Sequence, residues 1–97
     1  MLFMILFEDD PARIEMRRRH VQAHLDFLAK HKDRILGAGS LRDEPDGTPS
    51  GGLWIVDVAD RAEAAAIYKD DPFWTFGLRR SVTIKHWSKA FERRREI

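Results

Sequence analysis

The stretch Leu2–Phe7 reads LFMILF, a run of six apolar residues that ends where Glu8 begins a short acidic segment. Its short length and its Phe and Ile content predict a β-strand. Because successive side chains of a strand point to opposite faces, both faces of this strand are apolar. The stretch Leu53–Val58, LWIVDV, has the same character except at Asp57. Each of these strands therefore needs apolar cover on two sides.

A helix is predicted directly after the first strand. Asp10 is a suitable N-cap, Pro11 fits the first helical position, and the helical pattern extends to about Lys32. At 100° per residue one narrow stripe of this helix is expected to face the core, formed by Ile14, Val21, Leu25 and Leu28. Three histidines fall together on one flank of that stripe: His20, His24 and His31.

The remaining elements complete a simple order. Arg34–Leu41 predicts a second strand, and the Pro- and Gly-rich stretch Arg42–Gly52 predicts the loop that joins it to Leu53–Val58. Asp60–Lys69 predicts a second helix, and Arg79–Ser88 alternates like a last strand. The order predicts an α+β fold of the ferredoxin-like βαββαβ type. This is a four-stranded antiparallel sheet with two helices on one face.

Two helices cover only one face of such a sheet. Because the strands Leu2–Phe7 and Leu53–Val58 are apolar on both faces, the other face would be a large exposed apolar patch on a monomer. We therefore expect a homodimer through the open sheet face, most simply with two copies related by a two-fold axis.

Length and composition limit the classes of function. The chain has 97 residues, which indicates a single domain over residues 1–97, with a charged C-terminal tail at 90–97. The net charge of +1 gives no electrostatic case for nucleic-acid binding. The absence of cysteine excludes disulfides and thiol chemistry and suits a reducing cytoplasm. No apolar stretch is long enough for a membrane span, and the N-terminal run does not have the features of a signal peptide.

A histidine at the border between core and water is a candidate for acid–base chemistry near neutral pH. His24 occupies such a position on the first predicted helix. Asp71 leaves the second helix on its inner side, just before Pro72 ends the regular pattern. We predict that His24 and Asp71 meet in the fold. They would form either a proton-transferring pair or a buried hydrogen bond that ties the two helices together.

Other side chains are candidates for contacting a substrate. Arg17 and Ser40 could polarise a substrate carbonyl, and His20 lies on the same helix flank as His24. The segment PFWTFG, residues 72–77, places Phe73 and Trp74 in one short turn. These aromatic side chains could form an apolar wall for a cyclic ligand, or they could pack in the core or an interface.

Metal and nucleotide cofactors are not predicted. His20 and His24 have the H-x₃-H spacing of helical zinc ligands, but Val21 follows His20 where a metalloprotease has a glutamate, and no third ligand is evident. The glycines Gly37 and Gly39 match neither a phosphate-binding loop nor a dinucleotide fingerprint. We therefore expect chemistry that needs no cofactor.

The order of elements and several short motifs resemble the YCII-related domain family across nearly the whole chain. The motifs are Ala23-His24-Leu25, Gly37-Ala38-Gly39, Gly51-Gly52 and Asp71-Pro72-Phe73. The resemblance implies a dimeric ferredoxin-like fold of the dimeric α+β barrel type and a His/Asp pair in a pocket. It also implies an activity, since a few relatives have been proposed to act as lyases or dehydrochlorinases on ring compounds. The chain has an extra histidine before the family position, so either His20 or His24 could be the key residue.

Three functions are compatible with these features. The first is a small cofactor-free enzyme of lyase or isomerase type that uses His24 and Asp71 on a small, possibly cyclic, carbonyl compound. The second is a binding or sensing module that holds such a ligand without converting it. The third is a dimeric accessory domain in which the histidines are structural.

Overall fold

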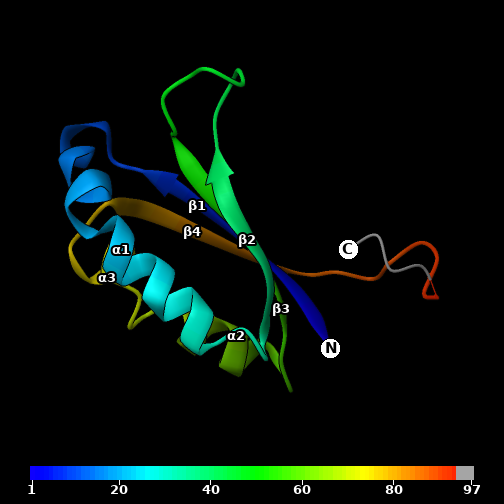
Figure 1. Ribbon diagram of the computed structural model, residues 1–97. Coiled ribbons are helices and arrows are strands. Elements are labelled where there is room, and N and C mark those ends of the chain that lie inside the picture. The colour runs from blue at the N-terminus through cyan, green and yellow to red at the C-terminus, as the bar shows by residue number, and fades with distance from the viewer. Residues whose placement is uncertain (94–97) are drawn as a thin grey trace.

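The computed structural model describes residues 1–93 and has the predicted ferredoxin-like architecture (Figure 1). Its four antiparallel strands form one sheet in the order β2-β3-β1-β4. The strands are β1 (Leu2–Asp9), β2 (Ile35–Leu41), β3 (Gly51–Asp57) and β4 (Arg79–His86). The helices are α1 (Glu15–Lys30), α2 (Arg61–Ile67) and α3 (Pro72–Thr75), with a 3₁₀ turn η1 (Pro11–Arg13) before α1. The prediction of fold class is confirmed.

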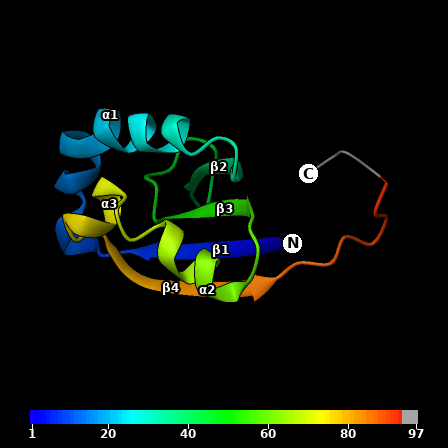
Figure 2. The same cartoon turned by 90° about the horizontal axis from the view of Figure 1, so that it is seen from below.

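All three α-helices lie on one side of the sheet (Figure 2). The core lies between the helices and the sheet, and β1 contributes every second residue to it: Phe3, Ile5 and Phe7. Trp54 and Val56 of β3 face the same side, and α2 adds Ala64 and Ile67. The period-two alternation of the strands thus separates a covered face from an open face.

The caps of the helices explain where they begin. Asp10 accepts a hydrogen bond from the Ala12 backbone at 2.9 Å, but it caps η1, and α1 begins only at Glu15. Asp60 caps α2 through the backbone N–H of Glu63. The segment predicted as a turn after Asp71 is the short helix α3. Each acid satisfies a backbone donor that has no partner within its helix.

The predicted core stripe of α1 is confirmed at Leu28 and wrong at Val21 and Leu25. Val21 and Leu25 are 42% and 49% exposed, and His24 is the buried residue of this helix. Phe27 and Leu28 are half-buried against the core. The side of α1 that faces the core is therefore the one that carries His24, Phe27 and Leu28.

The hairpin loop is shorter than predicted, because Gly51 and Gly52 belong to β3. A Cβ atom on Gly51 would lie 2.2 Å from the carbonyl oxygen of Phe7. Only glycine permits β1 and β3 to approach this closely without a shift of backbone.

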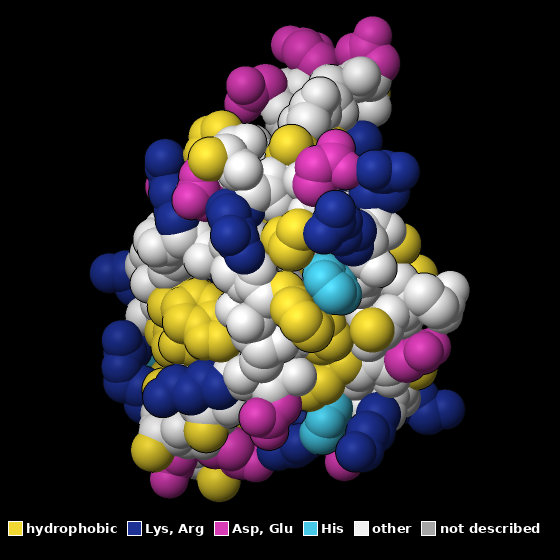
Figure 3. Space-filling view, turned by 90° about the vertical axis from the view of Figure 1, so that its left-hand side faces the viewer, with side chains coloured by type: hydrophobic (Ala, Val, Ile, Leu, Met, Phe, Trp, Pro, Cys, Tyr) yellow, Lys and Arg dark blue, Asp and Glu magenta, His cyan; other side chains and the backbone are white. Residues whose placement is uncertain are grey.

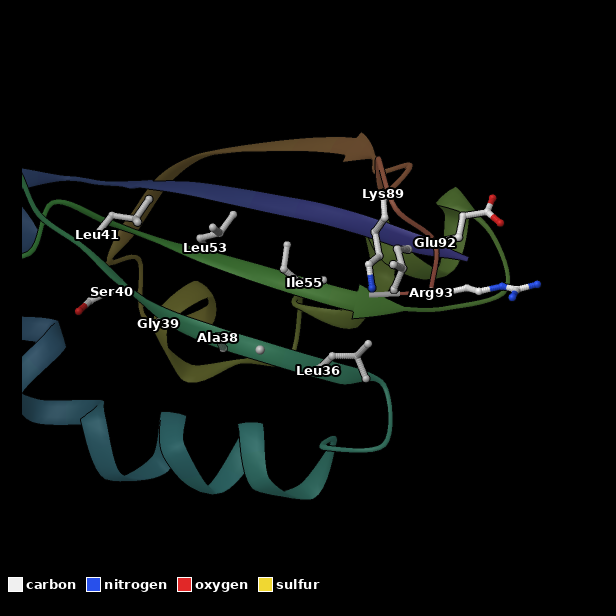
Figure 4. Close-up of a pocket in the computed structure, with 12 residues that line it drawn as sticks. Leu36, Ala38, Gly39, Ser40, Leu41, Leu53, Ile55, Lys89, Glu92 and Arg93 are labelled. Carbon is white, nitrogen blue, oxygen red and sulfur yellow. The ribbon is translucent and has the colours of Figure 1, made fainter. Parts of the chain in front are cut away.

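The open face of the sheet is apolar. Leu36 and Leu41 are exposed, and a hollow of about 1050 Å³ lies over this face. Figure 4 shows Leu53 and Ile55 pointing away from the helices into the hollow, with Lys89 and Glu92 at one end. Four residues of the predicted charged tail, 94–97, lie outside the described residues. Within residues 1–93 no helix is both long and apolar enough to cross a membrane.

Candidate functional site

His24 and Asp71 lie next to each other on the covered side of the sheet. His24 comes from the middle of α1, and Asp71 is the N-cap of α3. The distance from His24 Nδ1 to Asp71 Oδ1 is 2.7 Å, and the same oxygen accepts the Phe73 backbone N–H at 3.3 Å. A carboxylate beside Nδ1 favours the tautomer in which Nδ1 carries the proton. The other ring nitrogen, Nε2, is then a hydrogen-bond acceptor.

The Nε2 atom of His24 retains access to solvent. Three side-chain atoms among the described residues are both enclosed and without a partner: Arg17 Nε, Asp71 Oδ2 and Arg79 Nε. His24 Nε2 is not one of them, and no described residue forms a hydrogen bond with it. The His24 side chain is 10% exposed, whereas that of Asp71 is 1% exposed. The pair is therefore a buried carboxylate behind an imidazole that is open at one edge.

Aromatic rings fix the orientation of the imidazole. The Phe73 ring stacks on His24 with centroids 3.9 Å apart and planes 9° apart. The Trp54 ring lies on another side, at 6.4 Å. Since the Asp71 hydrogen bond restrains the ring in its plane and Phe73 restrains it out of the plane, His24 has little rotational freedom.

A second polar group, the Arg17–Asp9–Arg79 triad, adjoins the pair. Arg17 Nη2 donates to Asp9 Oδ2 at 2.6 Å and to the Gly51 carbonyl at 3.3 Å, and Arg79 Nη1 donates to Asp9 Oδ1 at 2.7 Å. Both guanidinium carbons lie over the Phe73 ring, at 5.1 and 5.2 Å from its centroid. The same ring thus contacts His24 and both arginines.

Arg79 is unusual for an arginine because its side chain is only 2% exposed. Its guanidinium also lies 4.7 Å from the centroid of the Phe7 ring. Burial lowers the pKa of Arg79, and the hydrogen bond that Arg79 donates to Asp9 opposes that shift. Arginine nevertheless remains protonated in proteins. Asp9 and Arg79 therefore form a buried ion pair, in which Arg79 Nε has no hydrogen-bond partner.

Sequence reasoning missed Asp9 and Arg79. Asp9 lies beyond the predicted end of the first strand at Phe7, but β1 continues through it. The alternation that turns Phe3, Ile5 and Phe7 inward also turns Asp9 inward. An acid in phase with a buried stripe requires a buried cation as its partner. Extending the strand by two residues would have identified this signal.

The other expected residues lie at varying distances from the pair. His20 stacks on Phe76 with centroids 3.8 Å apart, and Trp74 packs edge-on against Tyr68. Ser40 is exposed on β2, pairs with Gly52 across the sheet, and accepts a hydrogen bond from Arg42 at 2.7 Å. The structure thus brings together His24, Asp71, Phe73 and Arg17, and leaves His20, Trp74 and Ser40 outside this cluster.

In the described part of the chain, no three His, Asp or Glu residues lie close enough together to hold a metal ion. The hollow on the open face includes Ser40 but neither member of the His24–Asp71 pair. The surface on the α1 and α3 side is mixed, with apolar side chains among Arg and Lys and with histidines beside them (Figure 3). The exposed apolar residues of these two helices and their ends include Phe76, at 48%.

Residues 1–88 match the sequence model of the YCII-related domain. The chain belongs to the YCII-related domain family. The match covers every strand and helix described above. A search of curated protein sequences found no match.

Solved structures extend the comparison. The chain is 26% identical to 5-chloro-2-hydroxyhydroquinone dehydrochlorinase (TftG) from Burkholderia phenoliruptrix AC1100, solved in complex with 2,5-dihydroxybenzoquinone. The TM-score is 0.82, and the alignment covers 91% of this chain and 94% of that one. A putative antibiotic biosynthesis monooxygenase from Bacteroides thetaiotaomicron VPI-5482 is 13% identical, with a TM-score of 0.57 and coverage of 94% and 90%. An uncharacterised NIPSNAP domain protein from Burkholderia xenovorans is 16% identical, with a TM-score of 0.51 and coverage of 93% and 95%. The last two share the fold.

Proposed function

We propose that this protein is a small enzyme of lyase or isomerase type that moves a proton on a small cyclic carbonyl compound. His24 is the general base and acid, and Asp71 holds its tautomer and stabilises the imidazolium. The chemistry needs no cofactor, because a carbon next to a carbonyl is acidic enough for a positioned imidazole to deprotonate it.

One observation carries the proposal: Asp71 lies 2.7 Å from Nδ1 of His24, while Nε2 has no partner among the described residues and is open to solvent. A general base needs a free acceptor atom, a fixed orientation and a group that stabilises its protonated form. His24 has all three.

The similarity to TftG supports the reaction type. That protein is a dehydrochlorinase, and its structure contains a dihydroxylated quinone. Loss of hydrogen chloride from a ring is an elimination, in which a base removes or relocates a proton. A substrate of the same class, a small ring with carbonyl and hydroxyl groups, is the proposed ligand here. Trp74 and His20, which are half-buried, would supply aromatic surface for it, and the buried Phe73 would support the imidazole from behind.

The test is deuterium incorporation from D₂O into small cyclic carbonyl compounds, followed by NMR. The panel begins with 2,5-dihydroxybenzoquinone and includes simple cyclic ketones. Wild-type protein should accelerate exchange into at least one compound. Binding without any exchange across the panel would reject the enzyme and favour a ligand-binding module.

A second candidate is a dimeric accessory domain in which the pair is structural. The observation in its favour is that Asp71 also caps α3, so that one oxygen joins α1 to the start of α3. In that case a substitution of His24 would lower stability and would change no ligand-dependent signal.

The proposed assembly is a homodimer through the open sheet face. Leu36 and Leu41 are exposed there, and Leu53 and Ile55 point into an uncovered hollow. Burial of this apolar area against a second copy would remove it from water. No role for nucleic acid or membrane is proposed. A cytoplasmic location stays a prediction from the absence of cysteine, and cell fractionation would test it.

A further inference from the structure

Charge is distributed unevenly across the candidate site. The Arg17–Asp9–Arg79 triad contains two cations and one anion and therefore carries a net positive charge. The His24–Asp71 pair is net negative while the imidazole is neutral. Since Phe73 contacts both groups, the site has a negative end at the base and a positive end at Arg17.

The donors of Arg17 can be counted. Its Nη2 atom donates to Asp9 and to the Gly51 carbonyl, and its Nε atom is enclosed without a partner. The Nη1 atom has no partner among the described residues and is not enclosed. The two N–H groups of Nη1 are therefore free to bind a ligand, while the rest of the guanidinium is anchored.

We infer that Arg17 is the oxyanion-binding residue of this site and that Asp9 and Arg79 are its positioning residues. The inference rests on the proposed function and specifies its substrate as a ring whose carbonyl oxygen gains negative charge. In the reaction step, the C–H bond next to the carbonyl breaks and the proton moves to His24 Nε2. The electron pair of that bond forms a C=C bond, and the carbonyl oxygen becomes an enolate oxygen that accepts from Arg17 Nη1.

The electrostatics of this step agree with the layout. Protonation of His24 neutralises the negative end of the site, and the new oxyanion neutralises the positive end. Both charges develop beside groups that are already in place. Such preorganised donors stabilise the transition state because they do not have to reorient during the reaction.

Asp9 and Arg79 act through Arg17. Asp9 fixes one edge of the Arg17 guanidinium, and without Arg79 its carboxylate would bind Arg17 alone and cancel its charge. Arg79 supplies the second cation, and its 2% exposure keeps it behind the ligand rather than in contact with it. The buried pair thus lets Arg17 be held by an acid while the group remains net positive.

The experiment compares an anionic with a neutral ring of similar shape. The probes are 2,5-dihydroxybenzoquinone, whose acidic hydroxyls are ionised at neutral pH, and 2,5-dimethoxybenzoquinone, which has no acidic hydroxyl. Binding to the full chain is measured by calorimetry for wild type, Arg17→Met, Arg17→Lys and Asp9→Asn. Arg18→Met is the matched control, because Arg18 is the exposed neighbour and pairs with Glu15. Circular dichroism verifies the fold of each variant.

Both Arg17 variants should bind the anionic ring at least roughly tenfold more weakly, which corresponds to the loss of a charge-assisted hydrogen bond. Binding of the neutral ring should stay within about twofold by the same criterion. Asp9→Asn should raise KM for a converted substrate. It should leave the pH dependence of the catalysed rate largely unchanged. Arg17→Lys keeps the positive charge and removes the guanidinium, so it still tests the role of Arg17 if Arg17→Met does not fold.

Equal weakening for both rings, or an Arg17 variant that matches Arg18→Met, would overturn the inference. If wild type binds the anionic ring through Arg17 but catalyses no exchange, the proposed function fails and the anion site stands. If exchange is catalysed and Arg17 variants retain the full rate, the inference fails and the proposed function stands. Binding of neither ring overturns the inference, and the proposed function is then decided by exchange into the cyclic ketones of the panel.

Discussion

His24 and Asp71 are 47 residues apart in the chain, yet His24 Nδ1 lies 2.7 Å from Asp71 Oδ1. The contact joins the middle of α1 to the N-cap residue of α3. The side of α1 that makes this contact faces the core, and Val21 and Leu25 are exposed. The hydrogen bond also restrains the orientation of the imidazole.

Asp71→Asn should reduce any catalysed exchange by roughly 10²–10⁴-fold, which is the usual contribution of one acid–base group. Asparagine still caps a helix, so the fold should persist, but it neither charges the site nor fixes the tautomer. The measurement is the exchange rate by NMR. Asp70→Asn is the control, because Asp70 is the exposed neighbour. Equal rates in the two variants would contradict the role of Asp71.

Arg79→Met should destabilise the protein by about 3–5 kcal/mol, because it leaves the buried carboxylate of Asp9 with Arg17 as its only cation. Arg80→Met should cost less than about 1 kcal/mol, since Arg80 and Glu8 form an exposed pair. Urea unfolding of the two variants measures the difference. The double variant with Asp9→Asn should recover part of the loss. Similar costs for Arg79 and Arg80 would show that the buried pair is not a structural requirement.

Tyr68 should titrate above its ordinary pKa of 10.0, because burial raises the pKa of its hydroxyl. The folded state then holds the proton more tightly than the unfolded state. The resulting stability is fully present below the unfolded pKa and is lost as pH rises through the folded pKa. The chain has a single tyrosine, so its phenolate absorbance reports Tyr68 alone. A titration at the ordinary value, or a Tyr68→Phe variant with the same alkaline loss of stability, would refute this prediction.

Ile55→Glu should convert the protein to a monomer if the open sheet face is the dimer interface. The new carboxylate would be desolvated on association without a partner. Sedimentation equilibrium of wild type and variant measures the change. Leu25→Glu places the same charge at an exposed position of α1 and should leave the assembly intact. A monomeric wild type, or dissociation by Leu25→Glu alone, would place the interface elsewhere or remove it.

Gly51→Ala should destabilise the fold by about 1–3 kcal/mol, because its Cβ would meet the Phe7 carbonyl oxygen at 2.2 Å and force β1 and β3 apart. Gly39→Ala is the matched control on β2, where a Cβ has no neighbour within 4 Å. Thermal unfolding compares the two. A neutral Gly51→Ala would mean that the two strands adjust at little cost.

The sheet was predictable because β1 and β3 are so apolar that they have few alternatives to paired strands. The caps Asp10 and Asp60 and the glycine-rich hairpin then give the order of elements. The predicted strand boundaries were less accurate at glycines, because glycine occurs both in loops and at strand positions where another group comes close. Gly51 and Gly52 look like loop residues, yet they are strand residues that let another backbone or the Arg79 side chain approach.

The site was only partly predictable. His24 and Asp71 were singled out from family resemblance and helix position, but the rotation of α1 was wrong because periodicity counts apolar residues only. A buried polar contact can outweigh two exposed apolar side chains, and no pattern of hydrophobicity records it. Asp9 and Arg79 pair across 70 residues, and only the strand register brings them together.

The most direct test of the central claim is the rate at which the His24→Gln variant catalyses deuterium exchange into a bound ring compound. Glutamine can still donate to Asp71, so the fold should remain, but the basic Nε2 is lost. His86→Gln is the control, because His86 is an exposed residue at the end of β4 and has no place in the proposed site. His24→Gln should reduce the catalysed rate by at least about a hundredfold, and His86→Gln should change it little. A His24→Gln variant that exchanges protons as fast as wild type would contradict the central claim.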